Sequence, residues 1–289
     1  MQKIIIPRSI EQFKSTLEYV DAYLIGISDL CISNGLNINI GVLSDIIDLC
    51  KDKEIYININ KNIENKELIN LKDILLKLNH YHIKGVFYYD VAILNMSLEM
   101  DLNYDLIWAS EHATTNYDTI NYWNSFGVNG ALLSSDITVR EVMDIKKNTH
   151  CKLIVPIFGY QQMFVSKRNL VNNYLKQFSL IDNSNINYIK KEGKIYPIVD
   201  NKLGTEVYTN YILNGICEYF NFVDNNIDYV LLDSFNLDDN EFVEVLKIVH
   251  NLKRDNVLKS YEQINSMFDN VDTGFLYKET IARVKKNEK

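Results

Sequence analysis

The sequence predicts an α/β protein, and within that class a TIM-type (β/α)8 barrel with parallel strands. Eight short apolar runs alternate with longer helical patterns along a chain of 289 residues. The runs are continuously apolar, which is typical of strands buried on both faces of a parallel sheet. Eight such units in one chain of this length match a TIM barrel. A doubly wound open sheet is the alternative.

Each predicted strand is a short apolar run that ends at a polar or turn-forming residue. The eight expected strands are residues 3–6, 22–27, 55–59, 85–89, 105–109, 130–133, 152–158 and 229–232. Helical spacing of apolar residues predicts helices over 10–19, 40–50, 64–78, 116–126 and 138–147. Ser9, Asn116 and Thr138 are suited to cap three of these helices, and Thr138 with Glu141 reads as a capping box.

The regular alternation breaks once, between the seventh and eighth strands. Residues 155–158 complete the seventh strand, GYQQ reads as a polar loop, and a short amphipathic helix follows Arg168. Residues 179–209 are polar, Asn-rich and without clear periodicity. We therefore expect a single barrel domain over 1–289, with a polar excursion inserted before the last strand at about 179–209. A small hairpin over 194–198 is its expected core.

The charge is distributed unevenly along the chain. The net charge is −8 with a pI of about 5.2, so the total does not indicate a strongly basic nucleic-acid binder. Residues 167–194 nevertheless carry six bases and two acids, and the tail 278–289 carries five bases and two acids. Residues 203–246 carry nine acids and no Lys or Arg. A polyanion would meet the two basic stretches, although ordinary solvated faces are the simpler interpretation of both.

The four cysteines, Cys31, Cys50, Cys151 and Cys217, are far apart and form no CxxC pair. They are expected to be free thiols in a reducing compartment. The N-terminal apolar run is too short for a signal peptide, and no run reaches the ~18 apolar residues of a membrane helix. The sequence therefore predicts a cytoplasmic protein that is not in a membrane.

Polar residues follow most of the predicted strands. In a barrel, the carboxyl ends of the strands meet at one mouth, where the site is built. Carboxylates that meet there raise one another's pKa, as a general acid or base requires. His112 is the best-placed histidine, because it follows a strand beside Glu111. Every one of these residues could instead cap a helix. The candidates are Asp29, Asn58, Asn60, Asp90, Glu111, His112, Asp136, Arg168 and Asp233.

Common catalytic and metal-binding motifs are missing from the sequence. It contains no HExxH, no GxSxG, no phosphate-binding GxxxxGK[ST] and no zinc-like His–Cys–Cys spacing. We therefore predict no metal site. Whether the protein is an enzyme stays open.

Three segments, IFGYQQMFVSKRNLVNNYL, YPIVDNKLGTEVYTN and DTGFLYKETIARVKK, together resemble sequences of the collagenase-like peptidases, peptidase family U32. IFGYQQMFVSKRNLVNNYL resembles the family signature of His-Gly-x-x-Cys, Tyr-Ser-x-Arg-Cys and Leu-x-Ser-x-Tyr. YPIVDNKLGTEVYTN resembles the Tyr-Pro-x-x-Glu-Asp-x-x-Gly-Thr-His segment, and DTGFLYKETIARVKK resembles the closing Thr-Gly-Phe-x-Tyr segment. The order and spacing fit nearly the whole chain. The retained signature residues are Gly159, Ser166, Arg168, Leu170 and Tyr174.

The departures from the family pattern concern its chemistry. Phe158 replaces the signature histidine, Gln162 and Asn169 replace two cysteines, and Glu206 stands at the Gly-Thr-His histidine. Of the acidic segment that ends the family's last strand, Asp233 remains. In cysteine-bearing relatives those thiolates are associated with an iron–sulfur cluster, which Gln and Asn cannot ligate. We predict no cofactor, and in particular no iron–sulfur cluster.

The resemblance implies three functions. The first is tRNA wobble uridine 5-hydroxylation, as an accessory or substrate-positioning subunit beside a larger, cluster-bearing paralogue. The second is a collagenase-like peptidase, and the third is a non-catalytic binding barrel. Self-association into homo-oligomers stays open. The expected catalytic candidates are Glu111, His112, Glu206 and Asp233, and the expected substrate contacts are Asn60, Asp90, Ser166, Lys167 and Arg168.

Overall fold

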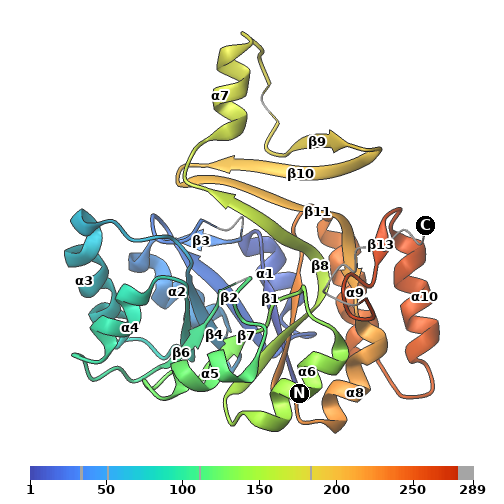
Figure 1. Ribbon diagram of the computed structural model, residues 1–289, viewed down its shortest axis with the longest axis horizontal. Coiled ribbons are helices and arrows are strands. Elements are labelled where there is room, and N and C mark those ends of the chain that lie inside the picture. Colours follow the sequence, from blue (N-terminus) through green and yellow to red (C-terminus); the bar gives the residue numbers. More distant parts are fainter. Residues whose placement is uncertain (33–34, 51, 111, 183, 279–289) are drawn as a thin grey trace, which may run out of the picture.

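The computed structural model describes residues 1–32, 35–50, 52–110, 112–182 and 184–278. Within them, parallel strands close into a barrel in the order β12-β1-β2-β4-β5-β6-β7-β8, and β12 pairs with β8 (Figure 1). The TIM-type fold class is confirmed. The barrel strands are β1 (Gln2–Ile6), β2 (Ala22–Ile27), β4 (Glu54–Ile59), β5 (Gly85–Tyr88), β6 (Asp105–Trp108), β7 (Gly130–Leu132), β8 (Lys152–Ser166) and β12 (Tyr229–Asp233).

Helices lie outside the barrel and cover its strands (Figure 1). Ser9, Asn116 and Thr138 cap helices as predicted, and the Thr138–Glu141 capping box is present. Two predicted helices, 40–50 and 64–78, begin with short 3-10 turns, Ile40–Val42 and Asn65–Glu67. The surrounding helices are α1 (Ile10–Thr16), α2 (Leu43–Cys50), α3 (Leu68–Leu78), α4 (Val91–Ser97), α5 (Tyr117–Asn124), α6 (Val139–Asn148), α8 (Tyr219–Asp224), α9 (Asp239–His250) and α10 (Val257–Met267).

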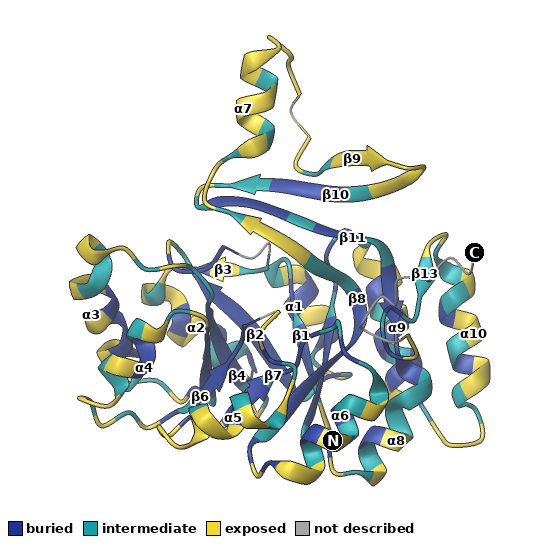
Figure 2. Ribbon diagram, in the orientation of Figure 1, coloured by how far each residue is buried: buried dark blue, intermediate teal, exposed yellow. Residues whose placement is uncertain are grey.

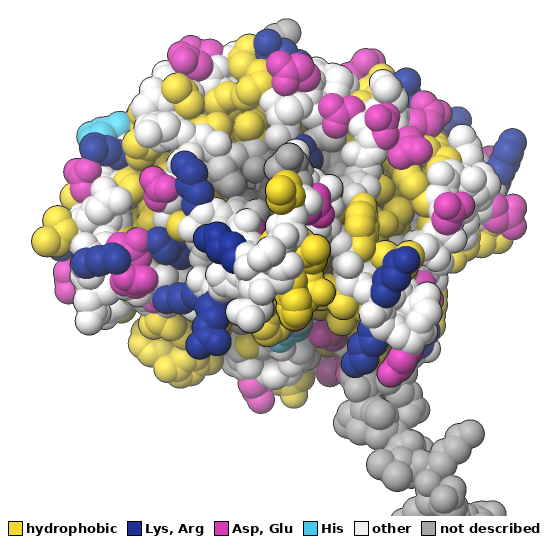
Figure 3. All heavy atoms as spheres, turned by 90° about the horizontal axis from the view of Figure 1, so that it is seen from above, with side chains coloured by type: hydrophobic (Ala, Val, Ile, Leu, Met, Phe, Trp, Pro, Cys, Tyr) yellow, Lys and Arg dark blue, Asp and Glu magenta, His cyan; other side chains and the backbone are white. Residues whose placement is uncertain are grey.

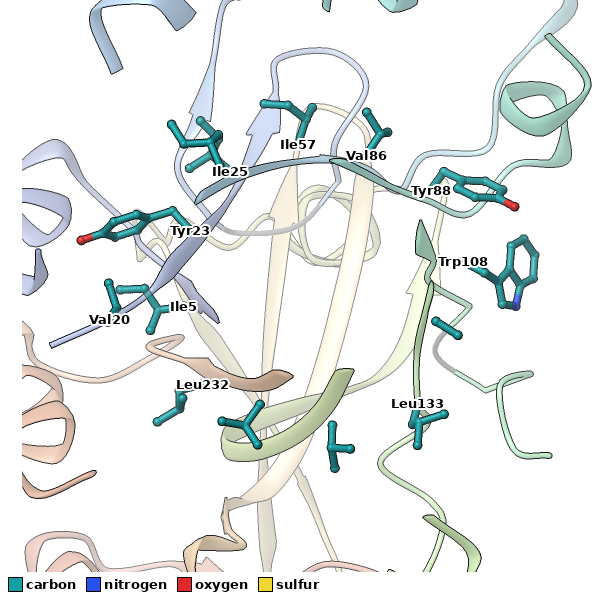
Figure 4. Close-up of a cluster of buried hydrophobic side chains, with 14 of the residues drawn as sticks. Ile5, Val20, Tyr23, Ile25, Ile57, Val86, Tyr88, Trp108, Leu133 and Leu232 are labelled. Carbon is teal, nitrogen blue, oxygen red and sulfur yellow. The ribbon is translucent and has the colours of Figure 1, made fainter. Parts of the chain in front are cut away.

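Two apolar layers stabilise the barrel, because successive side chains of a strand point to opposite faces. Ile5, Ile25, Ile57 and Val86 stand on the outer side of the strands, toward the helices (Figure 4). A second cluster of alternate positions fills the inside of the barrel. It contains Ile4, Leu24, Tyr56, Phe87, Ile107, Ile154, Tyr229 and Leu231. The barrel is therefore packed through its length, and space for a ligand is confined to its ends.

Ion pairs close the end of the barrel where the strands begin. Lys84 lies 2.9 Å from Glu54, Lys152 lies 2.7 Å from Asp105, and Tyr229 donates a hydrogen bond of 2.9 Å to Glu54. Contacts at this end of the barrel contribute to stability, whereas chemistry in this fold takes place at the opposite end.

The seventh barrel strand corrects the sequence prediction. The segment GYQQ is not a loop, because β8 continues through it to Ser166. Gly159 lies where β8 leaves the barrel, with φ at +109°. A Cβ there would lie 2.3 Å from the carbonyl oxygen of Asp233. Only glycine combines this backbone conformation with so close an approach of β12.

Beyond Gly159 the chain builds a projecting unit, which we call the arm (residues 160–213; Figure 1). The outer part of β8 pairs antiparallel with β11 (Gly204–Asn214), β11 with β10 (Lys194–Asn201), and β10 with β9 (Asn187–Lys191). Helix α7 (Leu170–Gln177) connects β8 to this sheet. The predicted excursion at 179–209, with its hairpin at 194–198, falls within the arm. Two short strands, β3 (Asn37–Ile38) and β13 (Val271–Asp272), flank β2 and β11.

Candidate functional site

A cavity of about 100 Å³ lies at the mouth of the barrel, where the strands end. Its lower wall comes from the barrel and its upper wall from the arm. Barrel residues include Asn58, Phe87, Leu231 and Asp233, and arm residues include Tyr160, Gln162, Glu206 and Tyr208. The arm therefore closes over the mouth, and the resulting space combines apolar walls with a few polar groups, as ligand sites commonly do.

Asp233, predicted at the mouth, is held by an arginine. Its Oδ1 pairs with Nη2 of Arg8, and it also accepts a hydrogen bond of 2.9 Å from the Phe235 amide. The guanidinium of Arg8 lies 5.3 Å from the centre of the Phe235 ring, in cation–π geometry. Both charged side chains are largely buried, so the pair is a fixed feature of the mouth and keeps the Asp233 carboxylate oriented.

Glu206 is the second predicted carboxylate at the mouth, and it is 0% exposed. The side-chain amide of Gln162 donates a hydrogen bond to its Oε1. Burial raises the pKa of Glu206 to about 8, while hydrogen bonds from Tyr208 and Gln162 and the charge of Arg8 act in the opposite direction. Asp233 adds to the increase in the pKa of Glu206. The mouth therefore holds two carboxyl groups, one of them kept protonated near neutral pH.

Aromatic rings join the arm to this mouth. Tyr208 of β11 stacks on Phe235 with ring centres 3.7 Å apart, and Tyr160 of β8 meets the same ring edge-on at 6.0 Å. These contacts fix β8 and β11 relative to the end of β12. The positions of Gln162 and Glu206 follow from that anchoring.

A second, larger space of about 620 Å³ lies beside the cavity, between the rim of the barrel and the arm. We call it the groove. Asn60, Tyr89 and His112 line it from the barrel, and Phe164 and Lys167 line it from the arm. Asn60 and Gln162 line both spaces, so the groove adjoins the cavity. Nδ1 of His112 lies 3.4 Å from Oδ2 of Asp136, at the exposed rim.

The predicted site residues thus fall into separate places. Glu206 and Asp233 share the cavity, whereas His112 and Lys167 lie in the groove. Asn60 lines both spaces and also accepts a hydrogen bond of 2.8 Å from the Ile32 amide. Glu111 lies outside the described residues.

Asp90 has a structural duty. It caps α4 through a hydrogen bond of 2.9 Å from the Ala92 amide, and it accepts another of 2.8 Å from the Ile63 amide. These bonds satisfy its carboxylate without a ligand. In the sequence, helix capping is the alternative role of each residue after a strand. Capping explains the position of Asp90.

Ser166 ends β8, and Arg168 lies between β8 and α7, where two signature segments of the sequence meet. The amides of Leu170 and Asn172 donate hydrogen bonds of 2.8 Å to Thr205 Oγ1 and Asp200 Oδ2, respectively. Thr205 Oγ1 also lies 2.6 Å from the carbonyl oxygen of Arg168. The helix is therefore capped by residues of β10 and β11, which fixes the backbone of Arg168 and leaves its side chain exposed.

Replacing Thr205 with Val is expected to loosen α7, because the buried hydroxyl that accepts from Leu170 is lost. We expect a loss of about 1–2 kcal/mol in the local stability of this helix. Hydrogen–deuterium exchange of residues 170–177 measures it. Thr205→Ser keeps the hydroxyl and is the matched control, so equal exchange in the two variants would contradict this account of the cap.

The sequence prediction missed three residues of the mouth. Arg8 lies just after the first strand, and its position at a strand end is the signal that could have identified it. Gln162 was noted only as the replacement of a signature cysteine, and Tyr208 carried no signal. Both reach the mouth because β8 continues past the barrel and pairs with β11. Both belong to the polar or aromatic wall of the cavity.

The residues at the mouth do not fit an iron–sulfur cluster. Gln162 and Asn169 supply no thiolate, and Cys31, Cys50 and Cys151 are buried singly. Burial raises the pKa of Cys50 to about 12, which disfavours the thiolate form. Across the described residues, His, Cys, Asp and Glu form no group of three or more that could hold a metal ion. The absence of a cluster stays a prediction.

The family model described as Peptidase family U32 matches residues 8–278. The chain belongs to peptidase family U32. A curated relative, tRNA hydroxylation protein P2 of Bacillus subtilis (strain 168), is 25% identical over 252 residues, covering 79% of this chain and 81% of the relative.

Solved structures similar to this U32 protein are more distant. The spore cortex-lytic enzyme SleL of Bacillus megaterium QM B1551 gives a TM-score of 0.43 at 12% identity, covering 87% of this chain and 74% of that one. The tryptophan synthase complex of Pyrococcus furiosus gives 0.44 at 10% identity, covering 92% and 97%.

The structure explains what the three signature segments of this U32 protein do. The first forms β8 and α7, the second forms β10 and β11, and the two meet at Gly204, where a Cβ would lie 1.9 Å from the carbonyl oxygen of Ser166. In the third, the Leu276 carbonyl accepts a hydrogen bond of 3.0 Å from Val139, the first residue of α6. Much of the signature therefore holds the arm and the closing segment in place. In the described part of the chain, no helix is both long and apolar enough to cross a membrane.

Proposed function

We propose that this U32 family protein takes part in the 5-hydroxylation of the tRNA wobble uridine, as a subunit that positions the substrate. The observation that carries the proposal is the likeness to tRNA hydroxylation protein P2 over 79% of this chain. The match to the family model runs over residues 8–278, so it covers the barrel and the arm together and includes the residues that form the mouth.

An accessory role is supported by the residues at the signature positions. Gln162 and Asn169 stand where cluster-bearing relatives have cysteines. Electron transfer through a cluster would then be the task of another protein. A larger, cluster-bearing paralogue is the partner we propose.

The surface of the arm supports a protein partner. Helix α7 has no buried residue, and α7 and β9 are largely exposed, whereas β10 and β11 carry the buried residues of the arm (Figure 2). Concentrated exposure of large apolar side chains is typical of an interaction surface. The exposed apolar residues are Met163, Phe164, Val165, Leu170, Tyr174, Phe178, Leu180, Ile181, Tyr188, Ile189 and Ile195. We propose that the paralogue covers part of this surface.

At the mouth, Glu206 and Asp233 are the groups suited to handle a proton. The carboxyl of Glu206, whose pKa burial raises, can donate a proton or a hydrogen bond, and the side-chain oxygens of Asp233, held by Arg8, can accept one. Lys167 and Arg168 are exposed near the entrance and are suited to phosphate contact. We propose these four residues as the functional set, with His112 at the rim.

Deleting the gene is expected to remove 5-hydroxyuridine-derived nucleosides from total tRNA, and complementation should restore them. Nucleoside mass spectrometry of tRNA from the deletion strain and the complemented strain measures both. An unchanged nucleoside profile, with any paralogue also deleted, would refute the proposed function.

The family description favours one other candidate function, a peptidase. Two carboxyl groups at one mouth are compatible with acid–base hydrolysis. If the protein is a peptidase, the purified chain should cleave gelatin, and Glu206→Gln should abolish cleavage. Absence of cleavage with and without added divalent metals would remove this candidate.

A further inference from the structure

The groove between the arm and the barrel rim differs from the mouth in its side chains. The mouth holds two carboxyl groups, whereas the groove is lined by lysines and aromatic rings. Its rim carries three lysines, Lys61 from the barrel and Lys167 and Lys202 from the arm. Two aromatic side chains, Tyr89 and Phe164, line it from opposite sides. Seen from above, Lys and Arg side chains gather beside exposed apolar ones on this face (Figure 3).

The positive charge of the groove is only partly neutralised. Lys61 is bound, since its Nζ lies 2.5 Å from Glu67 and 3.2 Å from the carbonyl oxygen of Asp29. Lys167 and Lys202 are exposed, and among the described residues neither has a carboxylate within 4 Å. Glu64 also lines the groove, and its hydrogen bond with Lys66 at 2.9 Å lowers its pKa, with a smaller contribution from the charge of Lys167. On a chain of net charge −8, this is a local site for an anion.

The aromatic side chains give the groove its second property. Tyr89 is 42% exposed and Phe164 is 49% exposed, although both are large rings that burial would stabilise. Exposed rings beside unpaired cations are the combination that binds single-stranded nucleic acid, since bases stack on the rings and phosphates contact the cations. A base-paired duplex hides the faces of its bases, so it could use only the cations.

The groove also leads to a polar position whose hydrogen bonding is incomplete. Gln162 lines both the groove and the cavity, and its amide nitrogen is bound to Glu206. Its Oε1 is buried and has no hydrogen-bond partner in the described part of the chain. A buried acceptor without a donor is costly, so this position favours a ligand or water that supplies one.

We propose that the groove binds a single-stranded segment of RNA, with phosphates on Lys167 and Lys202 and bases stacked on Tyr89 and Phe164. The choice of RNA over other single-stranded polyanions rests on the proposed function. The segment would lie across the entrance to the cavity, so that one unpaired base comes next to Gln162. This assigns the arm a second role beside that of a protein surface, because its inner side forms one wall of the RNA site.

Fluorescence anisotropy with a labelled anticodon stem–loop RNA tests the proposal, using the full chain alone and together with any paralogue that copurifies. A fully base-paired duplex of equal length is the comparison ligand. The Lys167→Ala/Lys202→Ala variant is expected to bind about tenfold more weakly at moderate salt. The slope of log K against log salt should become shallower by about 1.4, as expected for two lost single-strand phosphate contacts.

Two further variants separate charge from stacking. Lys147→Ala/Lys259→Ala removes the same charge from exposed positions on α6 and α10 that do not line the groove, and it should bind like the wild type. Tyr89→Ala/Phe164→Ala should weaken binding by about tenfold or more with an unchanged salt slope, since stacking is not ionic. A wild-type preference for the duplex, or equal binding by both lysine variants, would overturn the proposal.

Failure of the RNA-binding groove can be distinguished from failure of the proposed function in tRNA modification. If deletion removes the modified nucleoside but the Lys167→Ala/Lys202→Ala protein restores it fully and binds RNA normally, the tRNA role stands and the groove assignment fails. If the deletion strain has normal tRNA, the proposed function fails, and anisotropy still decides whether the groove binds RNA. A third outcome is that the wild type does not bind RNA and that Lys167→Ala/Lys202→Ala no longer binds the paralogue. The groove would then be a protein-binding surface, and the proposal would be overturned.

Discussion

Glu206→Gln is expected to raise the melting temperature by several degrees at pH 8 and to change it little at pH 5. Burial raises the pKa of Glu206 from 4.5 to about 8. Between these values the unfolded chain releases the proton while the folded chain keeps it. Folding stability therefore falls as the pH rises through this window. The loss in the free energy of unfolding reaches up to about 5 kcal/mol, at ~1.4 kcal/mol per pKa unit. Gln does not ionise, so the variant does not lose this free energy as the pH rises.

Melting curves of wild type and Glu206→Gln from pH 5 to pH 8 measure this effect. The two melting temperatures should diverge as the pH rises. Glu262→Gln, which removes an exposed carboxyl on α10, is the matched control and should follow the wild type at every pH. Parallel curves for wild type and Glu206→Gln would mean that Glu206 is ionised in the folded protein. The protonated carboxyl proposed at the mouth would then be wrong.

Gly159→Ala is expected to cause a large loss of stability, because a side chain at this position meets backbone atoms of the neighbouring strand. The methyl group would lie 2.3 Å from the Asp233 carbonyl oxygen, on a backbone with φ at +109°. Relief requires β8 and β12 to separate at the point where the barrel closes. We expect a loss of more than about 3 kcal/mol in the free energy of unfolding, measured by urea denaturation.

Gly193→Ala separates backbone strain from crowding. Gly193 also has a positive φ, +78°, but nothing lies within 4 Å of its Cβ position in the turn between β9 and β10. We expect a loss of about 1 kcal/mol there, from backbone strain alone. Equal losses at the two positions would show that the contact with Asp233 does not limit how β8 leaves the barrel.

Gly159 also connects stability to the site. Asp233 is the last residue of β12 at this contact, and Gln162 lies three residues further along β8 than Gly159. A displacement of β8 would therefore move Gln162 away from Glu206 and alter the cavity. Partial unfolding of the arm without loss of the barrel would appear as increased hydrogen exchange in β8, β10 and β11 only.

The sequence by itself determined the barrel. Runs such as Ala22–Ile27 are apolar at every position, and in the structure all six residues are buried. That pattern requires cover on both faces, which helices outside and side chains inside provide. The caps at Ser9, Asn116 and Thr138 were equally predictable, because a cap depends on residues within one turn of the helix.

Tertiary structure decided the arm and most of the site. GYQQ lacks the apolar character of a buried strand, and it forms a strand because the residues of β11 that pair with it, Tyr208, Ile212 and Leu213, supply its hydrogen-bond partners. Glu206 was a candidate from its signature position, but its burial, and with it the pKa of about 8, arises from the closing of the arm over the mouth. Arg8 meets Asp233 because the first and last strands are neighbours in the closed barrel. Local pattern sets each strand and cap, whereas long-range pairing sets which side chains meet.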